Sequence, residues 1–398
     1  MLQDRKTSRD SRKRRYAGAL AAAVLLHGIP SAGWVHPYQP PHVRDSAIVR
    51  QALESNPASR SMDTLTLAFI GDVMLHQAQI AGSLRDDGSH DFTGYFSSIA
   101  DDLAEADIAT ANMEFTLAGE PYTGYPSFSA PDSYAEYMAE CGIDVFLTAN
   151  NHILDKGEKG LARTIRTYRE LERKYGVRMT GCAENEEAML AGYPLMMSCD
   201  GLKIAFINFT YGTNTGFGKT FPGTNYTDME KIAGAIKRAE DLGAGLIIAL
   251  PHWGEEYSTS HSGSQEKLAQ WLADKGVGLI VGTHPHVVQD TGIIGTDKGE
   301  VPVIYSLGNA ISNMSARNTQ IGLMLEMKII RDGFGEVVSL EPCYTFLWTS
   351  LPGRLAGRHC TVKVKDMLGK RDEWISPYEY DKMVSTYSDI KEVTGIED

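Results

Sequence analysis

The stretch LTLAFIGDVMLH, residues 65–76, introduces a pattern that recurs along the chain: an apolar run of strand character ends in a glycine and a carboxylate, Asp72. Further runs of this kind occupy residues 107–112, 143–149, 203–209, 245–250, 277–282 and 301–307. Between them lie amphipathic stretches, such as residues 160–176 and 264–276, with apolar residues three and four positions apart and a glycine at the end. This alternation predicts an α/β fold with a largely buried sheet.

Composition divides the chain into four predicted parts. They are a basic N-terminus with a signal or anchor segment (1–35), a linker rich in proline, serine and charge (36–63), the alternating α/β domain (64–319) and a β-rich C-terminal extension with a tail (320–398). In the extension, IGLMLEMKII and EVVSLEPCYTFLW are separated by RDGFG, which indicates a hairpin. The last twenty or so residues are charged and predict a helix or a loose tail.

The first part has the charged-then-apolar order of an export signal. Seven cations face only two aspartates in the first fifteen residues. The apolar run from Ala17 to Ile29 is about 13 residues long, which suits a signal peptide and is short of the roughly 20 that span a bilayer. Counted through to Val35 it reaches spanning length, so cleavage and retention as an anchor both stay open. The cations should remain inside, which predicts an extracytoplasmic protein, membrane-anchored or secreted.

Charge and cysteine content narrow the class of protein. The formal net charge of -13 argues against a nucleic-acid surface, which needs a basic footprint. It also disfavours a polyanionic substrate unless a metal supplies positive charge. The five cysteines show no CxxC spacing, so neither a zinc finger nor a disulfide framework is expected, and Cys141 is predicted to pack in the core.

The residues that follow the strands carry the candidate chemistry. Six strand ends bear metal-capable or hydrogen-bonding side chains: Asp72; Asn112 and Glu114; Asn150, Asn151, His152 and Asp155; His252 and Glu256; His284 and His286; and Asn309. With His76, five of the eleven histidines fall in these loops. Ligands of open α/β sheets bind beyond the carboxyl ends of the strands, so we expect these loops to converge on one site.

The types of side chain indicate a metal. Carboxylates, an amide oxygen and neutral imidazoles suit first-row divalent ions such as zinc, manganese or iron, whereas calcium sites lack histidine and structural zinc sites are rich in cysteine. A carboxylate able to bridge, with enough ligands for two ions, predicts a two-metal hydrolytic centre. His284 and His286, one residue apart, should point to the same side of an extended segment.

Structural roles for the same residues stay open. Asp72 and Glu114 could cap helices or serve as ordinary loop carboxylates. The pair His284 and His286 could be buried histidines that bond carbonyl groups. The segment around Asn151 could be a tight turn rich in asparagine.

Eight motifs carry a family resemblance. In order, GDVML, ANMEFTL, YPSFSAPD, TANNHILDKG, YGTNTG, HWGEEY, GTHPHVVQ and YSLGN resemble the poly-γ-glutamate capsule-biosynthesis protein (CapA) family of the calcineurin-like metallophosphoesterase superfamily. The resemblance runs from about residue 64 to 312. It implies a four-layer αββα sandwich with a dinuclear metal centre at the strand ends.

The resemblance also implies roles for individual residues. The metal residues it implies are Asp72, Glu114 as the bridge, Asn151, His252, His284 and His286. His152 would act as a general acid or stabilise an oxyanion. Asp155 would orient His152 or cap the following helix.

Two residues depart from the superfamily pattern. Met74 stands where an Asp-x-His motif has its histidine, and Glu114 stands where phosphoesterases carry aspartate. His76 either replaces the lost ligand or serves as a ligand-orienting or substrate residue. One ion of the centre is therefore expected to be held more weakly than the other.

Candidate substrate residues are His76, Glu256 and Asn309. Glu256 is open between orienting a ligand, contacting substrate and lying at the surface, and Asn309 between a pocket hydrogen-bond donor and a turn residue. Residues 121–132, PYTGYPSFSAPD, are expected to line the pocket, or alternatively to plug the sheet edge.

The resemblance implies a metal-dependent hydrolase or transferase-like protein that works on an anionic cell-surface polymer such as poly-γ-glutamate. Membrane synthase or export subunits are candidate partners, and the N-terminal segment would associate with the membrane. Two alternatives remain: a non-catalytic accessory subunit of a polymer synthase or exporter, which the loss of histidine at position 74 favours, and a phosphoesterase for small substrates.

Overall fold

The computed structural model describes residues 62–215 and 221–398. The predicted export segment, residues 1–35, and the linker up to residue 61 lie outside the described residues. Within the described ranges, no helix combines the length and the apolar character needed to cross a bilayer.

The first sheet is built around β1 (Asp63–Val73), which contains most of the stretch that opens the sequence pattern. Parallel to β1 lie β2 (Ile108–Met113), β3 (Val145–Leu147) and β4 (Arg178–Thr180). On its other side, the antiparallel strands are β14 (Ile321–Arg331), β15 (Val337–Ser350) and β16 (Cys360–Lys363). The hairpin predicted after Gln320 thus forms and extends this sheet, and the short β13 (Asn309–Ile311) pairs with the end of β1.

The second sheet has the order β11-β12-β10-β9-β7-β6. Its parallel strands are β7 (Leu202–Thr210), β9 (Leu246–His252), β10 (Leu279–Val281) and β12 (Gly299–Ile304). Its antiparallel edge strands are β6 (Leu195–Cys199) and β11 (Thr291–Thr296). A separate pair joins β5 (Cys182–Ala183) to β8 (Gly223–Thr224).

Alternation of side chains along the strands places the two sheets face to face. Leu67 and Phe69 of β1 pack in one core with Phe206 of β7, whereas Ala68 and Ile70 face a different core on the helical side. Successive side chains of a strand point to opposite faces, so an apolar run buried on both faces must be covered on both. The strand runs of the sequence therefore form the two inner layers.

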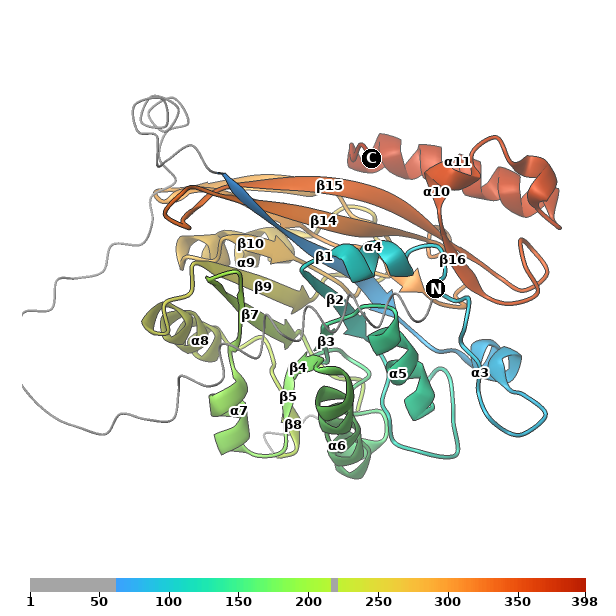
Figure 1. The fold of residues 1–398 in the computed structure, drawn as a ribbon, viewed down its shortest axis with the longest axis horizontal. Helices are drawn as coiled ribbons and strands as arrows, with labels where there is room; N and C mark the ends of the chain where they lie inside the picture. Colours follow the sequence, from blue (N-terminus) through green and yellow to red (C-terminus); the bar gives the residue numbers. More distant parts are fainter. Residues whose placement is uncertain (1–61, 216–220) are drawn as a thin grey trace, which may run out of the picture.

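Most of the described helices lie on the outer faces of the two sheets (Figure 1). The helices are α3 (Gln77–Ser83), α4 (Ala100–Glu105), α5 (Asp132–Glu140), α6 (Gly157–Tyr175), α7 (Glu186–Gly192), α8 (Met229–Asp241), α9 (Gly263–Asp274), α10 (Val364–Met367) and α11 (Pro377–Thr394), with a 3-10 turn η2 (Arg371–Glu373). Met138 of α5 packs on the first sheet, and Leu272 of α9 packs on the second. Three cores thus separate four layers, which confirms the predicted αββα sandwich. The predicted tail helix forms as α11, and its Met383 packs into the inter-sheet core.

Replacement of Phe206 by alanine is expected to lower the free energy of unfolding by about 3–5 kcal/mol, because the side chain is fully buried between the sheets. The same change at Phe334, which is 74% exposed, should cost less than about 0.5 kcal/mol. Urea unfolding of the two variants measures the difference. Equal losses would contradict a core between the sheets.

Candidate metal centre

Five of the predicted metal residues lie together where strands of both sheets end. They are Asp72 on β1, Glu114 directly after β2, His252 at the end of β9, and His284 and His286 after β10. None of the five is more than 3% exposed. The convergence expected for these loops is therefore present in the structure.

The glycine before Asp72 allows this convergence. A Cβ atom on Gly71 would lie 1.9 Å from the carbonyl oxygen of Gly308, so only glycine permits the approach. The amide of Asp72 donates to that same oxygen over 2.9 Å. The approach places Asn309 opposite Asp72 in the pairing of β13 with β1.

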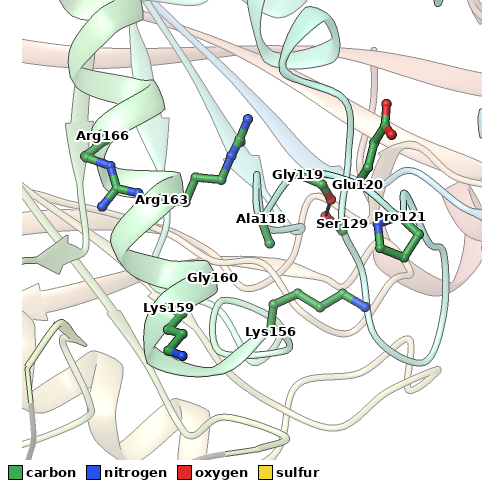
Figure 2. A pocket seen from close by; sticks show the side chains of 10 residues that line it. All are labelled: Ala118, Gly119, Glu120, Pro121, Ser129, Lys156, Lys159, Gly160, Arg163 and Arg166. Carbon is green, nitrogen blue, oxygen red and sulfur yellow. Dashed lines mark hydrogen bonds between the residues drawn. The ribbon is translucent and has the colours of Figure 1, made fainter. Parts of the chain in front are cut away.

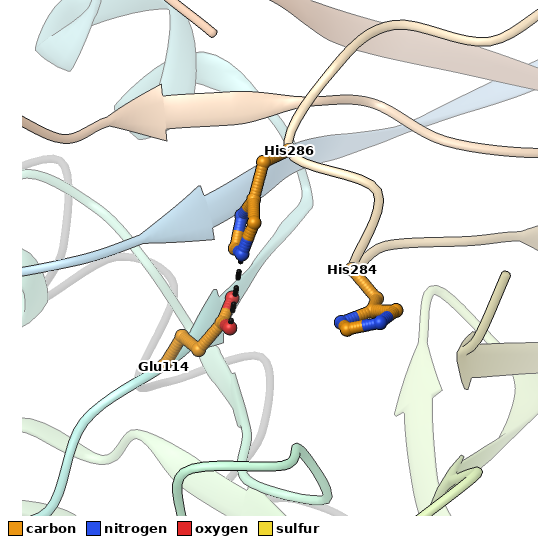
Figure 3. Close-up of side chains that lie close together, drawn as sticks. All are labelled: Glu114, His284 and His286. Carbon is orange, nitrogen blue, oxygen red and sulfur yellow. Dashed lines mark ion pairs between the residues drawn. The ribbon is translucent and has the colours of Figure 1, made fainter. Parts of the chain in front are cut away.

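Two overlapping groups of side chains could each hold a metal ion. One contains Glu114, His284 and His286, and the other contains Asp72, Glu114 and His252. In each group one ligand atom per residue lies within 4.8 Å of the others. Figure 3 shows the first group, with the His286 ring pointing at the Glu114 carboxylate. Glu114 belongs to both groups, as a bridging ligand would.

Unpartnered atoms at the centre test whether an ion fits. Oε1 of Glu114 and Nδ1 of His284 are buried without a hydrogen-bond partner among the described residues. Nε2 of His286 and Nε2 of His252 lie 3.7 and 3.9 Å from that Oε1, too far for hydrogen bonds. Buried polar atoms are normally satisfied, and carboxylate with imidazole suits a first-row divalent ion. The residues present therefore fit such ions.

The backbone at the two clustered histidines differs from the prediction. His284 has φ 103° and His286 has φ 59°, so the expectation of an extended segment was wrong. Both rings nevertheless reach the same ligand group. A positive φ in a residue other than glycine costs about 1–3 kcal/mol and is concentrated at functional sites. Local composition does not encode this conformation, which surrounding contacts hold in place.

Hydrogen bonds orient the imidazoles toward Glu114. Nδ1 of His252 lies 3.1 Å from Oγ1 of Thr283. Nδ1 of His286 lies 3.0 Å from Oδ1 of Asn309 and 3.1 Å from Oδ2 of Asp72. With Nδ1 engaged, Nε2 is the ring atom that faces the Glu114 carboxylate in both His252 and His286.

The Asn-His pair lies beside these ligands. Oδ1 of Asn151 is 3.1 Å from Nε2 of His252, and Nδ1 of His152 is 2.8 Å from Oδ2 of Asp155. The amide of Phe128 donates to the same Asp155 oxygen over 2.8 Å, and the Phe128 ring lies edge-on to His152. Asp155 thus orients His152; the N-cap position of α6 belongs to Lys156 instead. Residues 121–132 line this part of the site through Phe128.

Met74 and His76 occupy different surroundings. Met74 is buried at 2% exposure, and its carbonyl oxygen accepts a hydrogen bond from the Tyr134 hydroxyl over 3.0 Å. Nδ1 of His76 accepts from the backbone amide of Asn313 over 3.2 Å, and its ring contacts Phe128 edge-on. Neither ligand group includes His76. The structure therefore places His76 beside Phe128 and outside both ligand groups.

The other two candidate substrate residues, Glu256 and Asn309, differ from each other in position. Glu256 is exposed, and its neighbour Tyr257 donates its amide to the Pro285 carbonyl over 2.8 Å, which holds this loop beside the clustered histidines. Asn309 is 1% exposed, and its Nδ2 donates to the Thr319 carbonyl over 2.9 Å. Both ends of its amide are engaged within the protein, so its evident role is to orient His286.

Sequence reasoning left three site residues without a role. Nδ2 of Asn112 donates to Asp72 over 2.7 Å, so it fixes that carboxylate. The Tyr211 ring lies 4.5 Å from the ring of His284, and Nδ2 of Asn214 lies 3.4 Å from His152. Tyr211 and Asn214 follow β7, a strand end that was not counted among the six. The same rule applied to residues 203–209 would have found them.

Burial and charge set the protonation of the metal-free site. Burial, and then the Asp72 carboxylate, raise the pKa of Glu114 well above its ordinary value. Burial and nearby imidazoles lower the pKa of His252 well below its ordinary value and that of His284 to about 3. Burial lowers the pKa of His286, but the hydrogen bond and charge of Asp72 outweigh it and raise the pKa overall. His252 and His284 are therefore neutral near pH 7, as metal ligands must be.

Binding of Mn²⁺ to metal-free protein is expected to release protons, because Glu114 and His286 have raised pKa values and must lose their protons to act as ligands. Their protonated fractions fall as pH rises, so metal affinity should rise with pH. Titration calorimetry in two buffers of different ionisation heat measures the release. His261→Asn, outside the ligand groups, should behave like wild type. An affinity independent of pH with no proton exchange would contradict the assignment.

Comparison with known proteins finds relatives among capsule biosynthesis proteins. The family model described as "Bacterial capsule synthesis protein PGA_cap" matches residues 66–314. The chain is 27% identical over 296 residues to the capsule biosynthesis protein CapA of Bacillus anthracis, covering 71% of this chain and 68% of that protein. It is 24% identical over 294 residues to the PGA biosynthesis protein CapA of Bacillus subtilis (strain 168), covering 69% and 70%.

Two of the solved structures that match the chain are nucleotidases. The NAD nucleotidase of Haemophilus influenzae matches with a TM-score of 0.46 and 14% identity, over 83% of this chain and 68% of that one. The 5'-nucleotidase of Candida albicans matches with a TM-score of 0.38 and 12% identity, over 84% and 59%.

Proposed function

Because the chain belongs to the bacterial capsule synthesis protein PGA_cap family, we propose that it acts in the synthesis, anchoring or processing of an anionic capsule polymer such as poly-γ-glutamate through a metal-dependent hydrolytic centre. The observation that carries this proposal is the position of Glu114 in both ligand groups. The similarity to the CapA proteins supports the choice of polymer. An extracytoplasmic location and membrane partners belong to the same proposal.

The residues of the chain divide the work of hydrolysis. Those that would hold two divalent ions are Asp72, Glu114, Asn151, His252, His284 and His286. When bound, two such ions clamp the oxygens of a phosphoryl or acyl group and lower the pKa of water. Nδ1 of His152 is held by Asp155, so Nε2 is the ring atom that can stabilise an oxyanion or hold a proton for the leaving group.

The substitution at position 74 favours an accessory role as the second candidate. Met74 is buried at the position where the Asp-x-His motif has its histidine ligand. The group of Asp72, Glu114 and His252 therefore gains no further ligand from that motif. Soft thioether sulfur is a poor ligand for manganese or zinc. A chain of this kind could bind metal and polymer and assist a membrane synthase without catalysis.

Product analysis separates the candidates. The full chain is incubated with poly-γ-glutamate and Mn²⁺, and in parallel with an aryl phosphate, and products are followed by chromatography. The proposal predicts glutamate oligomers from wild type and none from His284→Ala. Bound metal without turnover of either substrate would instead support the accessory role, and turnover of the aryl phosphate alone would indicate a phosphoesterase for small substrates.

A further inference from the structure

A basic pocket lies between the start of α6 and the segment before residues 121–132. Its volume is about 330 Å³, within the roughly 300–1,000 Å³ of small-ligand pockets. Four cations, Lys156, Lys159, Arg163 and Arg166, and one acid, Glu120, are among its lining residues. This excess of positive charge contrasts with the net charge of -13 of the whole chain.

Three of the four cations are available to a ligand. In the ranges that the structure describes, no ion pair involves Lys156, Lys159 or Arg166. Arg163 is instead held by both oxygens of Asp132 over 2.8 Å. The pocket therefore keeps a net positive charge after the Arg163–Asp132 ion pair is counted.

One of the cations, Lys156, extends its side chain across the pocket. Figure 2 shows the Lys156 side chain crossing from the start of α6 toward Pro121, while the Glu120 carboxylate points away from that lysine. Lys159 and Arg166 are exposed and flank the pocket along α6. The N-terminus of α6 adds its positive partial charge, and Glu158 is the acidic residue in its first turn. An anionic group in the pocket would meet Lys156 first.

Two chain segments connect the pocket to the metal centre. Lys156 directly follows Asp155, which holds His152. Ser129 lines the pocket, and its neighbour Phe128 contacts His152. The Ser127 hydroxyl donates to the Asp155 carbonyl over 3.0 Å, which ties the two segments together. The pocket and the catalytic histidine thus share one wall.

We propose that this basic pocket is an anion-binding subsite that holds a second anionic unit of a polymeric substrate whose reacting unit lies at the metal centre. This inference rests on the proposed function, which supplies the polymeric substrate. The recognised chemistry is a carboxylate or phosphate group, bound by Lys156 with Lys159 and Arg166 at the rim. Successive units of such a polymer each carry a negative charge. One unit could therefore lie at the metal centre while a neighbouring unit binds the cationic pocket beside it.

Binding of labelled oligomers to the full chain tests the subsite. The double variant Lys156→Ala, Lys159→Ala should bind a γ-linked glutamate hexamer or a glycerol-phosphate hexamer roughly five- to tenfold more weakly than wild type, because each exposed charge contact is modest. The matched control is Lys231→Ala, Lys267→Ala, which removes the same charge from exposed positions on α8 and α9. It should change affinity less than about twofold. Fluorescence anisotropy measures both.

Several outcomes are distinguishable. Weakening of the phosphate hexamer alone supports the subsite but contradicts poly-γ-glutamate as the polymer. Weakening in the pocket variant without any hydrolysis in wild type likewise keeps the subsite and removes the catalytic proposal. Equal weakening in both double variants, or none in either, overturns the subsite. Loss of binding to anionic lipid vesicles with unchanged hexamer binding would also overturn it, in favour of a membrane surface.

Discussion

Glu114→Gln is expected to abolish the stabilisation of the protein by divalent metal. Glu114 lies in both ligand groups, so its loss should weaken both ion sites together. A ligand at about 100 times its Kd stabilises a folded protein by about 2.7 kcal/mol. Mn²⁺ should therefore raise the Tm of the wild type. The variant should show almost none. Thermal unfolding across a metal titration measures both.

The metal-free variant provides a second readout of the same change. Glu114 is a fully buried carboxyl group beside Asp72, and its pKa is raised by burial and by that neighbour. Glutamine removes the possibility of two like charges there, so metal-free Glu114→Gln should be at least as stable as metal-free wild type. Glu256→Gln, at an exposed rim position, is the matched control and should keep the full metal response. A full response in Glu114→Gln would show that Glu114 does not bridge.

His152→Ala is expected to lower the rate of hydrolysis by about 10²–10⁴-fold, the usual contribution of a general acid or base. Metal content should stay at the wild-type level, because neither ligand group includes His152. The assay uses whichever substrate the wild type turns over, with metal content measured on the same preparation. Asp155→Asn should give a smaller loss, since it disturbs the orientation of the ring and leaves the imidazole in place.

A second histidine-aspartate pair supplies the control. Nδ1 of His261 lies 2.8 Å from Oδ2 of Asp290, the same contact as in the site, but its ring stacks on Tyr305 and neither ligand group includes it. His261→Ala should leave the rate within about twofold of wild type. A His152→Ala enzyme that keeps its rate, or that loses its metal together with its rate, would contradict the role given to His152.

The alternation of apolar runs predicted α/β layering with a buried sheet, and the family resemblance supplied the four-layer sandwich. A rule about strand ends predicted that the candidate metal residues would gather in one place. Apolar runs buried on both faces must be inner strands, and polar residues directly after parallel strands gather at one edge. Asp72, Glu114, His252 and the pair at 284 and 286 all follow that rule. Applied without exception, the rule would also have included Tyr211 after β7.

Features that depend on contacts between distant segments could not be predicted. The pairing of β14 with β1 brings the segment after Gln320 into the first sheet, and composition alone had set that segment apart. Nothing in the local composition around His284 and His286 indicates their positive φ. Asn309 looked like a turn or pocket residue, and its contact with His286 appears only when β13 pairs with β1.

The metal content of the purified full chain tests the central claim most directly. Protein purified without chelator and incubated with Mn²⁺ or Zn²⁺ is freed of excess metal and analysed by plasma mass spectrometry. A two-metal centre bridged by Glu114 predicts about two ions per chain, with one lost before the other on dialysis because Met74 replaces a ligand. Retention of no ion after loading would contradict the account.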